Sequence, residues 1–155
     1  MTSSRIAVLA LAAVLAASAF AREAEREEED NPQAAAAAEH VQKGTALRQQ
    51  GKLAEAEREF NQAIKAYPEG LTSYLGRGQA RLLRLNYKGA VHDFNVYLKR
   101  VPNDTRVLRL RMEARRKLDP PDKAGACADA RKLLKKGKTP PDDEAKEYCE
   151  GQPGW

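Results

Sequence analysis

The feature that most constrains this chain is a period of 34 residues. Counted from Ala37, a first unit spans residues 37–70 and a second spans 71–104, and a more divergent third occupies 105–138. The first two units carry identical residues at four places that suit the packing of helical hairpins: Gly44 with Gly78, Ala56 with Ala90, Phe60 with Phe94, and Pro68 with Pro102. Such a period predicts a stack of similar units, in which the last may diverge because no further unit packs on it.

Each unit is predicted to be a hairpin of two helices. The composition, rich in Ala, Leu, Arg, Lys and Glu, favours helix, and 155 residues suffice for one modest domain. Gly51–Lys52 would make the first turn and Pro68 would end the second helix. Asn31 is predicted as the N-cap of the first helix, with Pro32 at its first position. An apolar stripe recurs at steps of three and four: Ala46, Leu47, Leu53, Ala56, Phe60, Ala63 and Ile64.

The pattern resembles the tetratricopeptide repeat family. The residues that fit it are Gly44, Ala56, Phe60, Ala63 and Pro68 in the first unit, and Tyr74, Gly78, Ala90, Phe94 and Pro102 in the second. The resemblance implies an all-α fold, a right-handed α-solenoid of about three helical hairpins. A capping helix is expected over residues 139–150, with Ala145 and Tyr148 facing inward, followed by a tail over 151–155.

Charged residues repeat in the same register. The seventh place of the units holds Lys43, Arg77 and Arg111. The twenty-third place holds Glu59 and Asp93, and Asp129 corresponds to it in the third unit, whose turn is longer by about two residues. We expect one ion pair between the two helices of each hairpin, worth about 0.2–1 kcal/mol if exposed.

Residues 1–21 have the features of a secretory signal peptide: Arg5, the apolar run Ile6–Phe20, and small residues around Ala19–Ala21. An uncleaved anchor is the alternative, although a membrane span needs about 20 apolar residues. Residues 22–36 would form an acidic disordered tail and a helix lead-in. The chain is thus expected to be exported, periplasmic or secreted, and soluble after cleavage.

Cys127 and Cys149 are the two cysteines of the chain. In an oxidising compartment they most simply form one disulfide, and the segment also resembles the closing segment of secreted bacterial proteins of this repeat type. A redox pair is the alternative, but the chain has no Cys-x-x-Cys spacing. Neither His40 nor His92 has further ligands at metal spacing, and neither a phosphate-binding loop nor a serine elbow is present. We expect no enzyme, no metal and no cofactor.

In the resembled family, the first helix of each hairpin lines a concave groove. The corresponding places are Ala38, Val41, Thr45, Arg48 and Gln49, then Thr72, Leu75, Gln79, Leu82 and Leu83, then Arg106, Arg109, Glu113, Arg116 and Lys117. From these, the predicted peptide-binding site comprises Thr45, Leu75, Gln79, Leu82, Leu83, Arg106, Arg109, Arg116 and Lys117. Some members of the family clamp the acidic C-terminus of a chaperone, and Val41, Thr45 and Gly76 differ from the residues that those members use. We therefore do not expect this chain to bind a chaperone in that way. An extended segment with apolar and acidic parts is the expected ligand.

Positive charge is concentrated beyond the first unit. Residues 71–140 hold 18 Lys or Arg against 6 Asp or Glu, a balance of +12. The expected function is a non-catalytic protein–protein interaction adaptor of the cell envelope. The alternative is an envelope protein that binds a polyanion, either anionic lipid or cell-wall polymer, through the basic surface of residues 77–138. Contact with a membrane surface stays open, whereas nucleic acid is disfavoured by export and by the scarcity of aromatic residues for stacking.

Overall fold

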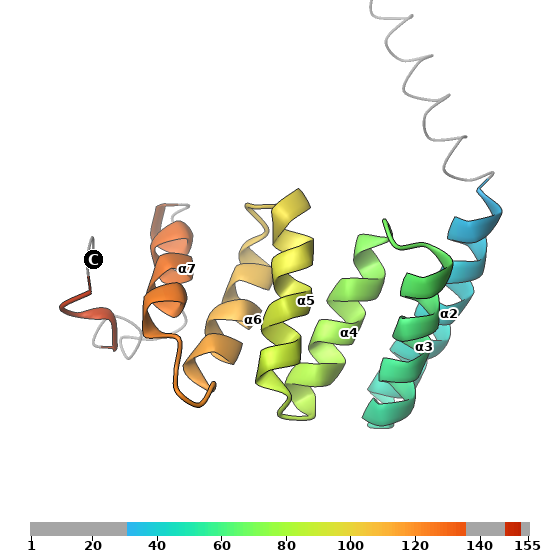
Figure 1. The fold of residues 1–155 in the computed structure, drawn as a ribbon, viewed down its shortest axis with the longest axis horizontal. Coiled ribbons are helices and arrows are strands. Elements are labelled where there is room, and N and C mark those ends of the chain that lie inside the picture. The colour runs from blue at the N-terminus through green and yellow to red at the C-terminus, as the bar shows by residue number, and fades with distance from the viewer. Residues whose placement is uncertain (1–30, 136–147, 153–155) are drawn as a thin grey trace, which may run out of the picture.

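The computed structural model describes residues 31–135 and 148–152. This part of the chain holds six helices, which pair into three antiparallel hairpins laid side by side (Figure 1). Each helix packs against the next one, and the first helices of successive hairpins, α2 with α4 and α4 with α6, also touch. The fold is therefore an α-solenoid of helical hairpins. The helices are α2 (Pro32–Gln49), α3 (Leu53–Ala66), α4 (Leu71–Leu83), α5 (Tyr87–Arg100), α6 (Thr105–Arg116) and α7 (Lys123–Lys135).

Polar caps fix where several helices begin. The Asn31 side chain accepts hydrogen bonds from the backbone N–H groups of Gln33 and Ala34, with Pro32 at the first helical position, as predicted. Asn86 caps α5 and Asp104 caps α6 in the same manner. The predicted signal peptide and acidic tail lie outside the described residues, as does most of the predicted capping helix.

Two phenylalanines set the spacing of the hairpins. Phe60 is fully buried between Gly44 of its own hairpin and Gly76 of the next, and a Cβ at Gly76 would overlap the Phe60 ring. Phe94 occupies the equivalent place beside Gly78. The glycines and phenylalanines that recur in the sequence thus pack against each other, and Gly76 joins them although it has no identical counterpart in the first unit.

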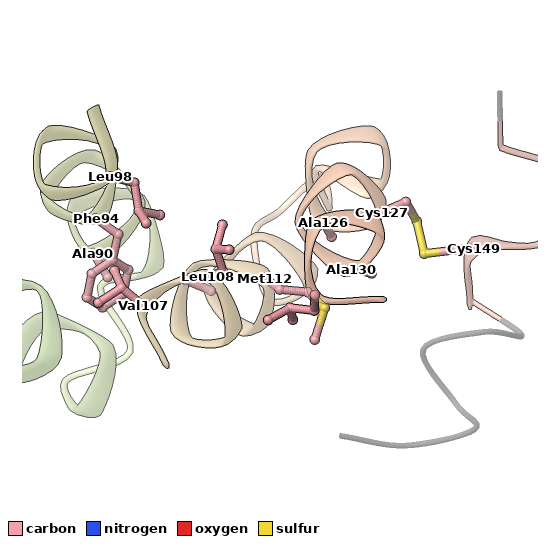
Figure 2. Close-up of a cluster of buried hydrophobic side chains, with 12 residues drawn as sticks. Ala90, Phe94, Leu98, Val107, Leu108, Met112, Ala126, Cys127, Ala130 and Cys149 are labelled. Carbon is pink, nitrogen blue, oxygen red and sulfur yellow. A yellow bond between two sulfur atoms is a disulfide. The ribbon is translucent and has the colours of Figure 1, made fainter. Parts of the chain in front are cut away.

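The buried apolar residues fall into two clusters of unequal size. The smaller one contains Ala56, Phe60 and Ala80, against which Val41 and Leu47 pack. The larger one runs from α5 to the C-terminal end of the described chain (Figure 2). It comprises Ala90, Phe94, Leu98, Val107, Leu108, Met112, Ala114, Ala126, Cys127, Ala130, Leu133 and Cys149. Ala46, expected on the apolar stripe, is exposed instead, because it falls on the outer side of α2.

The predicted ion pairs form in the second and third hairpins. Arg77 donates to Asp93 at 2.6 Å and Arg111 to Asp129 at 2.5 Å. Both aspartates are essentially inaccessible to solvent, so the pairs are buried rather than exposed. In the first hairpin, Glu59 was expected to pair with Lys43, but it contacts His40 Nδ1 at 2.8 Å instead. The prediction for that hairpin was wrong, because the histidine lies within reach on the same face of α2.

Each of these arginines also joins two hairpins. Arg77 Nη1 donates to the side-chain oxygen of Asn61 at 2.7 Å, and Arg111 Nη1 donates to that of Asn95 at 2.8 Å. Both asparagines belong to the preceding hairpin and lie two residues after its acidic position. We call this repeated contact the Arg–Asp–Asn ladder. In the second and third hairpins, one guanidinium ties the two helices together and also binds the preceding hairpin, because it offers several donors in a fixed fork.

Candidate peptide-binding groove

The apolar part of the predicted site is only partly available. Leu75 and Leu82 are half-buried and pack against the larger core cluster. Leu83, at the end of α4, is 57% exposed. The hydroxyl of Thr45 donates to the Val41 carbonyl oxygen at 2.8 Å, and Gln79 is half-buried. Among the predicted apolar residues, Leu83 therefore offers most of the surface to a ligand.

Two basic residues lie at the beginning of α6. Arg106 and Arg109 line an open hollow of about 370 Å³ together with Thr105 and Leu110. The Arg106 side chain is 67% exposed, and its nearest acidic contact is Asp104 at 3.9 Å. This hollow presents guanidinium groups to solvent, which suits a carboxylate ligand.

Asp104 is already engaged by its own helix and by Tyr97. Its side chain caps α6 and also accepts a hydrogen bond from the Tyr97 hydroxyl at 3.0 Å. Burial and this hydrogen bond together raise the pKa of Tyr97 above its ordinary value of 10.0.

The other two predicted basic residues lie at the opposite end of α6. The Arg116 guanidinium stacks over the Tyr148 ring at 5.0 Å. Lys117 contacts Glu113 at 3.4 Å and lies 6.0 Å from the Tyr87 ring centre. Arg116 follows Arg106 by ten residues, and a helix rises about 1.5 Å per residue, so the two lie about 15 Å apart along α6. The four residues therefore form two basic sites and not one.

Several other cations are neutralised inside the solenoid. Asp93 accepts from Arg81 as well as Arg77, and Asp129 accepts from Arg115 as well as Arg111. Glu57 of α3 receives both Arg81 and Arg84 of α4. The excess of positive charge counted in the sequence is therefore partly internal.

The Glu57 carboxyl has a shifted pKa. Burial acts to raise it, but the hydrogen bonds and charges of Arg81 and Arg84 outweigh burial and lower the pKa below its ordinary value of 4.5. Glu57 thus remains ionised and holds the first hairpin to the second.

A disulfide joins α7 to the C-terminal segment. Cys127 and Cys149 are bonded, with their Cα atoms 5.6 Å apart (Figure 2). Next to it, Tyr148 packs against the larger core cluster and lies under both Arg116 and Lys123. The bond holds this segment against the last hairpin.

Leu85, in the turn between α4 and α5, was not among the predicted site residues. It is 68% exposed and has a backbone φ of 62°, in the left-handed region that residues other than glycine rarely adopt. The equivalent residue of the first hairpin is Gly51, with φ of 76°. The repeat aligns Leu85 with Gly51, but the alignment does not show that the backbone keeps its left-handed conformation at the leucine.

Comparison with known proteins agrees with this geometry. The family model for the tetratricopeptide repeat matches residues 41–105. Those residues belong to the tetratricopeptide repeat family. The match begins in the middle of α2 and includes α3, α4 and α5, and the third hairpin continues the same stacking. The fold is that of a protein–protein interaction scaffold, and members of the family are generally non-catalytic.

Solved structures support the fold of the repeats. The tetratricopeptide repeat domain of Arabidopsis OM64 is similar with a TM-score of 0.61 and 23% identity, over 75% of this chain and 93% of that one. A tetratricopeptide repeat protein from Parabacteroides merdae is similar with a TM-score of 0.62 and 24% identity, over 82% of this chain and 47% of that one. No curated protein sequence matches the chain.

Two kinds of feature are absent from the part of the chain that the structure describes. Within residues 31–135 and 148–152, no three His, Cys, Asp or Glu side chains group as metal ligands. Across the same ranges, no helix has the length and apolar character needed to cross a membrane.

Proposed function

We propose that the chain is an exported, non-catalytic adaptor of the cell envelope that binds an extended, partly acidic segment of another protein. The segment would lie across α4 and α6, with its carboxylates at the basic residues of α6. The observation that carries this proposal is the exposure of Arg106 at a hollow that it shares with Arg109. Export is supported by the signal-like sequence of residues 1–21 and by a disulfide, which persists mainly in oxidising compartments.

A second candidate is polyanion binding through α7. Arg131, Lys132 and Lys135 line another open hollow of about 370 Å³ with Ala128. Against this candidate, the ion pairs inside the solenoid leave less free positive charge than the sequence count indicates.

The test begins with crosslinking in intact cells, which identifies the partner and its crosslinked segment. The affinity of that segment, made as a synthetic peptide, is then measured for the full chain and for two variants. Arg106, Arg109 and Arg116 are replaced by Ala in one, and Arg131, Lys132 and Lys135 by Ala in the other, so both lose three positive charges. We expect a loss of about tenfold or more only for the first variant.

Equal losses in the two variants would show a general charge effect and refute a specific site on α6. A loss confined to the α7 variant, with binding that falls steeply as salt is raised, would support the polyanion candidate instead.

A further inference from the structure

Arg48 lies in the last turn of α2, next to the face by which this helix meets the second hairpin. Gly44, four residues earlier, packs on the Phe60 ring, and Leu47 packs against the smaller cluster, to which Ala80 of α4 belongs. Residues four apart on a helix lie on the same side of it. The half-buried Arg48 side chain is therefore at the junction of the first two hairpins.

The equivalent residues of the later units also meet the element that follows. Arg48, Leu82 and Arg116 are separated by one period each. Leu82 packs against the larger core cluster, and the Arg116 guanidinium lies over the Tyr148 ring. The third unit thus provides a ring for the cation at this place, and the second has no cation there.

The Arg48 guanidinium has no partner within residues 31–135 and 148–152. Its Nε is inaccessible to solvent and makes no hydrogen bond. Every other buried or half-buried arginine of the described chain has a hydrogen bond, ion pair or ring contact: Arg77, Arg81, Arg111, Arg115, Arg116 and Arg131. Arg48 is thus a partly desolvated cation without an anion, and an acceptor at its exposed nitrogens would offset part of that cost.

The neighbours of Arg48 on its own helix face are uncharged. Val41 and Thr45 precede it by seven and three residues, and the Thr45 hydroxyl donates to the Val41 carbonyl oxygen. Anionic bilayers are held by clusters of several cations, whereas one guanidinium matches one carboxylate. A single acidic side chain therefore suits this position better than a polyanion does.

We infer that Arg48 binds one acidic residue of the partner segment, while a second acidic residue of the same segment lies at Arg106. This inference rests on the proposed function and deepens it. The segment would cross the first helices of all three hairpins, α2, α4 and α6, and would not be confined to α4 and α6.

The positions of the two arginines set the spacing of the two carboxylates. The first helices run in the same direction (Figure 1), with Arg48 near the end of α2 and Arg106 at the beginning of α6. Ten helical places separate them, which is about 15 Å along the helix axes. Two steps between neighbouring helices add about 18 Å sideways. The diagonal is about 23 Å, which an extended segment covers in about seven residues.

The test uses a random dodecapeptide library displayed on phage and selected on the full chain. Enriched peptides are synthesised, and each Asp or Glu is replaced in turn by Asn or Gln. Affinities are measured by fluorescence polarisation for the wild type, Arg48→Met and Arg106→Met, because methionine keeps the apolar stem and removes the charge. Arg58→Met, at an exposed position of α3, is the matched control.

We expect Arg48→Met to weaken the peptides by about tenfold and Arg58→Met by less than about twofold. One carboxylate of each peptide should contribute to affinity in the wild type but not in Arg48→Met. A second carboxylate, about seven positions away, should show the same dependence on Arg106. The Tm of Arg48→Met should be at least that of the wild type, since Nε has no hydrogen bond to lose. A residue that acts by packing alone would lower Tm and weaken all versions of a peptide equally.

The failures are distinguishable. If Arg48→Met binds as the wild type does while the Arg106, Arg109 and Arg116 variant loses affinity, the role of Arg48 is refuted and the proposed function stands. If neither variant loses affinity, or no acidic peptides are enriched, both are refuted. Equal losses in Arg48→Met and Arg58→Met, or dependence of Arg48 and Arg106 on adjacent carboxylates, would overturn the inference. Arg48-dependent binding to phosphatidylglycerol vesicles without peptide binding would overturn it in favour of a membrane surface.

Discussion

At the scale of single residues, the Arg–Asp–Asn ladder depends on two buried aspartates, Asp93 and Asp129. Each accepts from two arginines of the same hairpin while nearly inaccessible to water. A buried ion pair adds little net stability over apolar packing, but removal of one partner leaves an uncompensated charge. The ladder therefore makes each aspartate difficult to replace.

Replacement of Asp93 by Asn tests this effect. The amide keeps the shape but leaves Arg77 and Arg81 without their carboxylate, so we expect a loss of about 3–5 kcal/mol in the free energy of unfolding, measured with urea. The control is Glu69→Gln in the exposed pair of Glu69 with Arg100, for which about 1 kcal/mol or less is expected. Similar losses for the two variants would contradict the role of burial.

Contacts between residues were predictable from the sequence where both partners recur in the repeat. The pairs Arg77 with Asp93 and Arg111 with Asp129 follow from corresponding places in the units, once the longer turn of the third unit is allowed for. The fate of Lys43 could not follow, because His40 competes for Glu59 through contacts outside the repeat pattern. Neither could the partial burial of Leu75 and Leu82, since the repeat places a residue on a helix face without showing how far its neighbours cover it.

At the scale of elements, Glu57 is the contact whose strength depends on pH. Its lowered pKa means that the carboxylate stabilises the contact of α3 with α4 above pH about 4.5, and that this contribution is lost as the pH falls through the folded-state pKa. We expect the difference in Tm between the wild type and Glu57→Gln to be clear at pH 7 and to shrink towards pH 3.

Glu55→Gln, at an exposed position of the same helix, is the matched control and should differ little from the wild type at either pH. A Glu57→Gln difference that stays constant with pH would show that the side chain acts by packing and not by charge.

The elements themselves were largely predictable. The first turn, the N-cap at Asn31 and the stop near Pro68 follow from residues with strong local preferences, and the structure has them. The glycine-like turn at Leu85 was not predicted, because its conformation comes from the tertiary arrangement of the hairpin and opposes the preference of the residue.

At the scale of the whole molecule, the two apolar clusters divide the solenoid unevenly. α2 has only Ala37 and Gly44 fully buried, whereas the larger cluster joins α5, α6, α7 and the disulfide. Because each repeat is stabilised mainly by its neighbours, local opening should be easiest where the cluster is smallest.

Hydrogen exchange followed by mass spectrometry measures this difference. We expect the amides of α2 to exchange faster than those of α5 and α6. Reduction of the disulfide should increase exchange in α7 and leave α2 unchanged. Uniform protection along the chain, or a response of α2 to reduction, would show instead that the solenoid opens as a single unit.

The Arg–Asp–Asn ladder also determines how this array could be lengthened. The second hairpin carries both halves of the joint, Arg77 to reach backwards and Asn95 to receive the next arginine. The first offers Asn61 but has Lys43 in the arginine place, and the third has Arg131, a donor, where an acceptor would be needed. The first unit can therefore only begin an array joined in this way, the second can stand inside it, and the third can only end it. Residues 71–104 are the module that can be copied in tandem with every joint preserved.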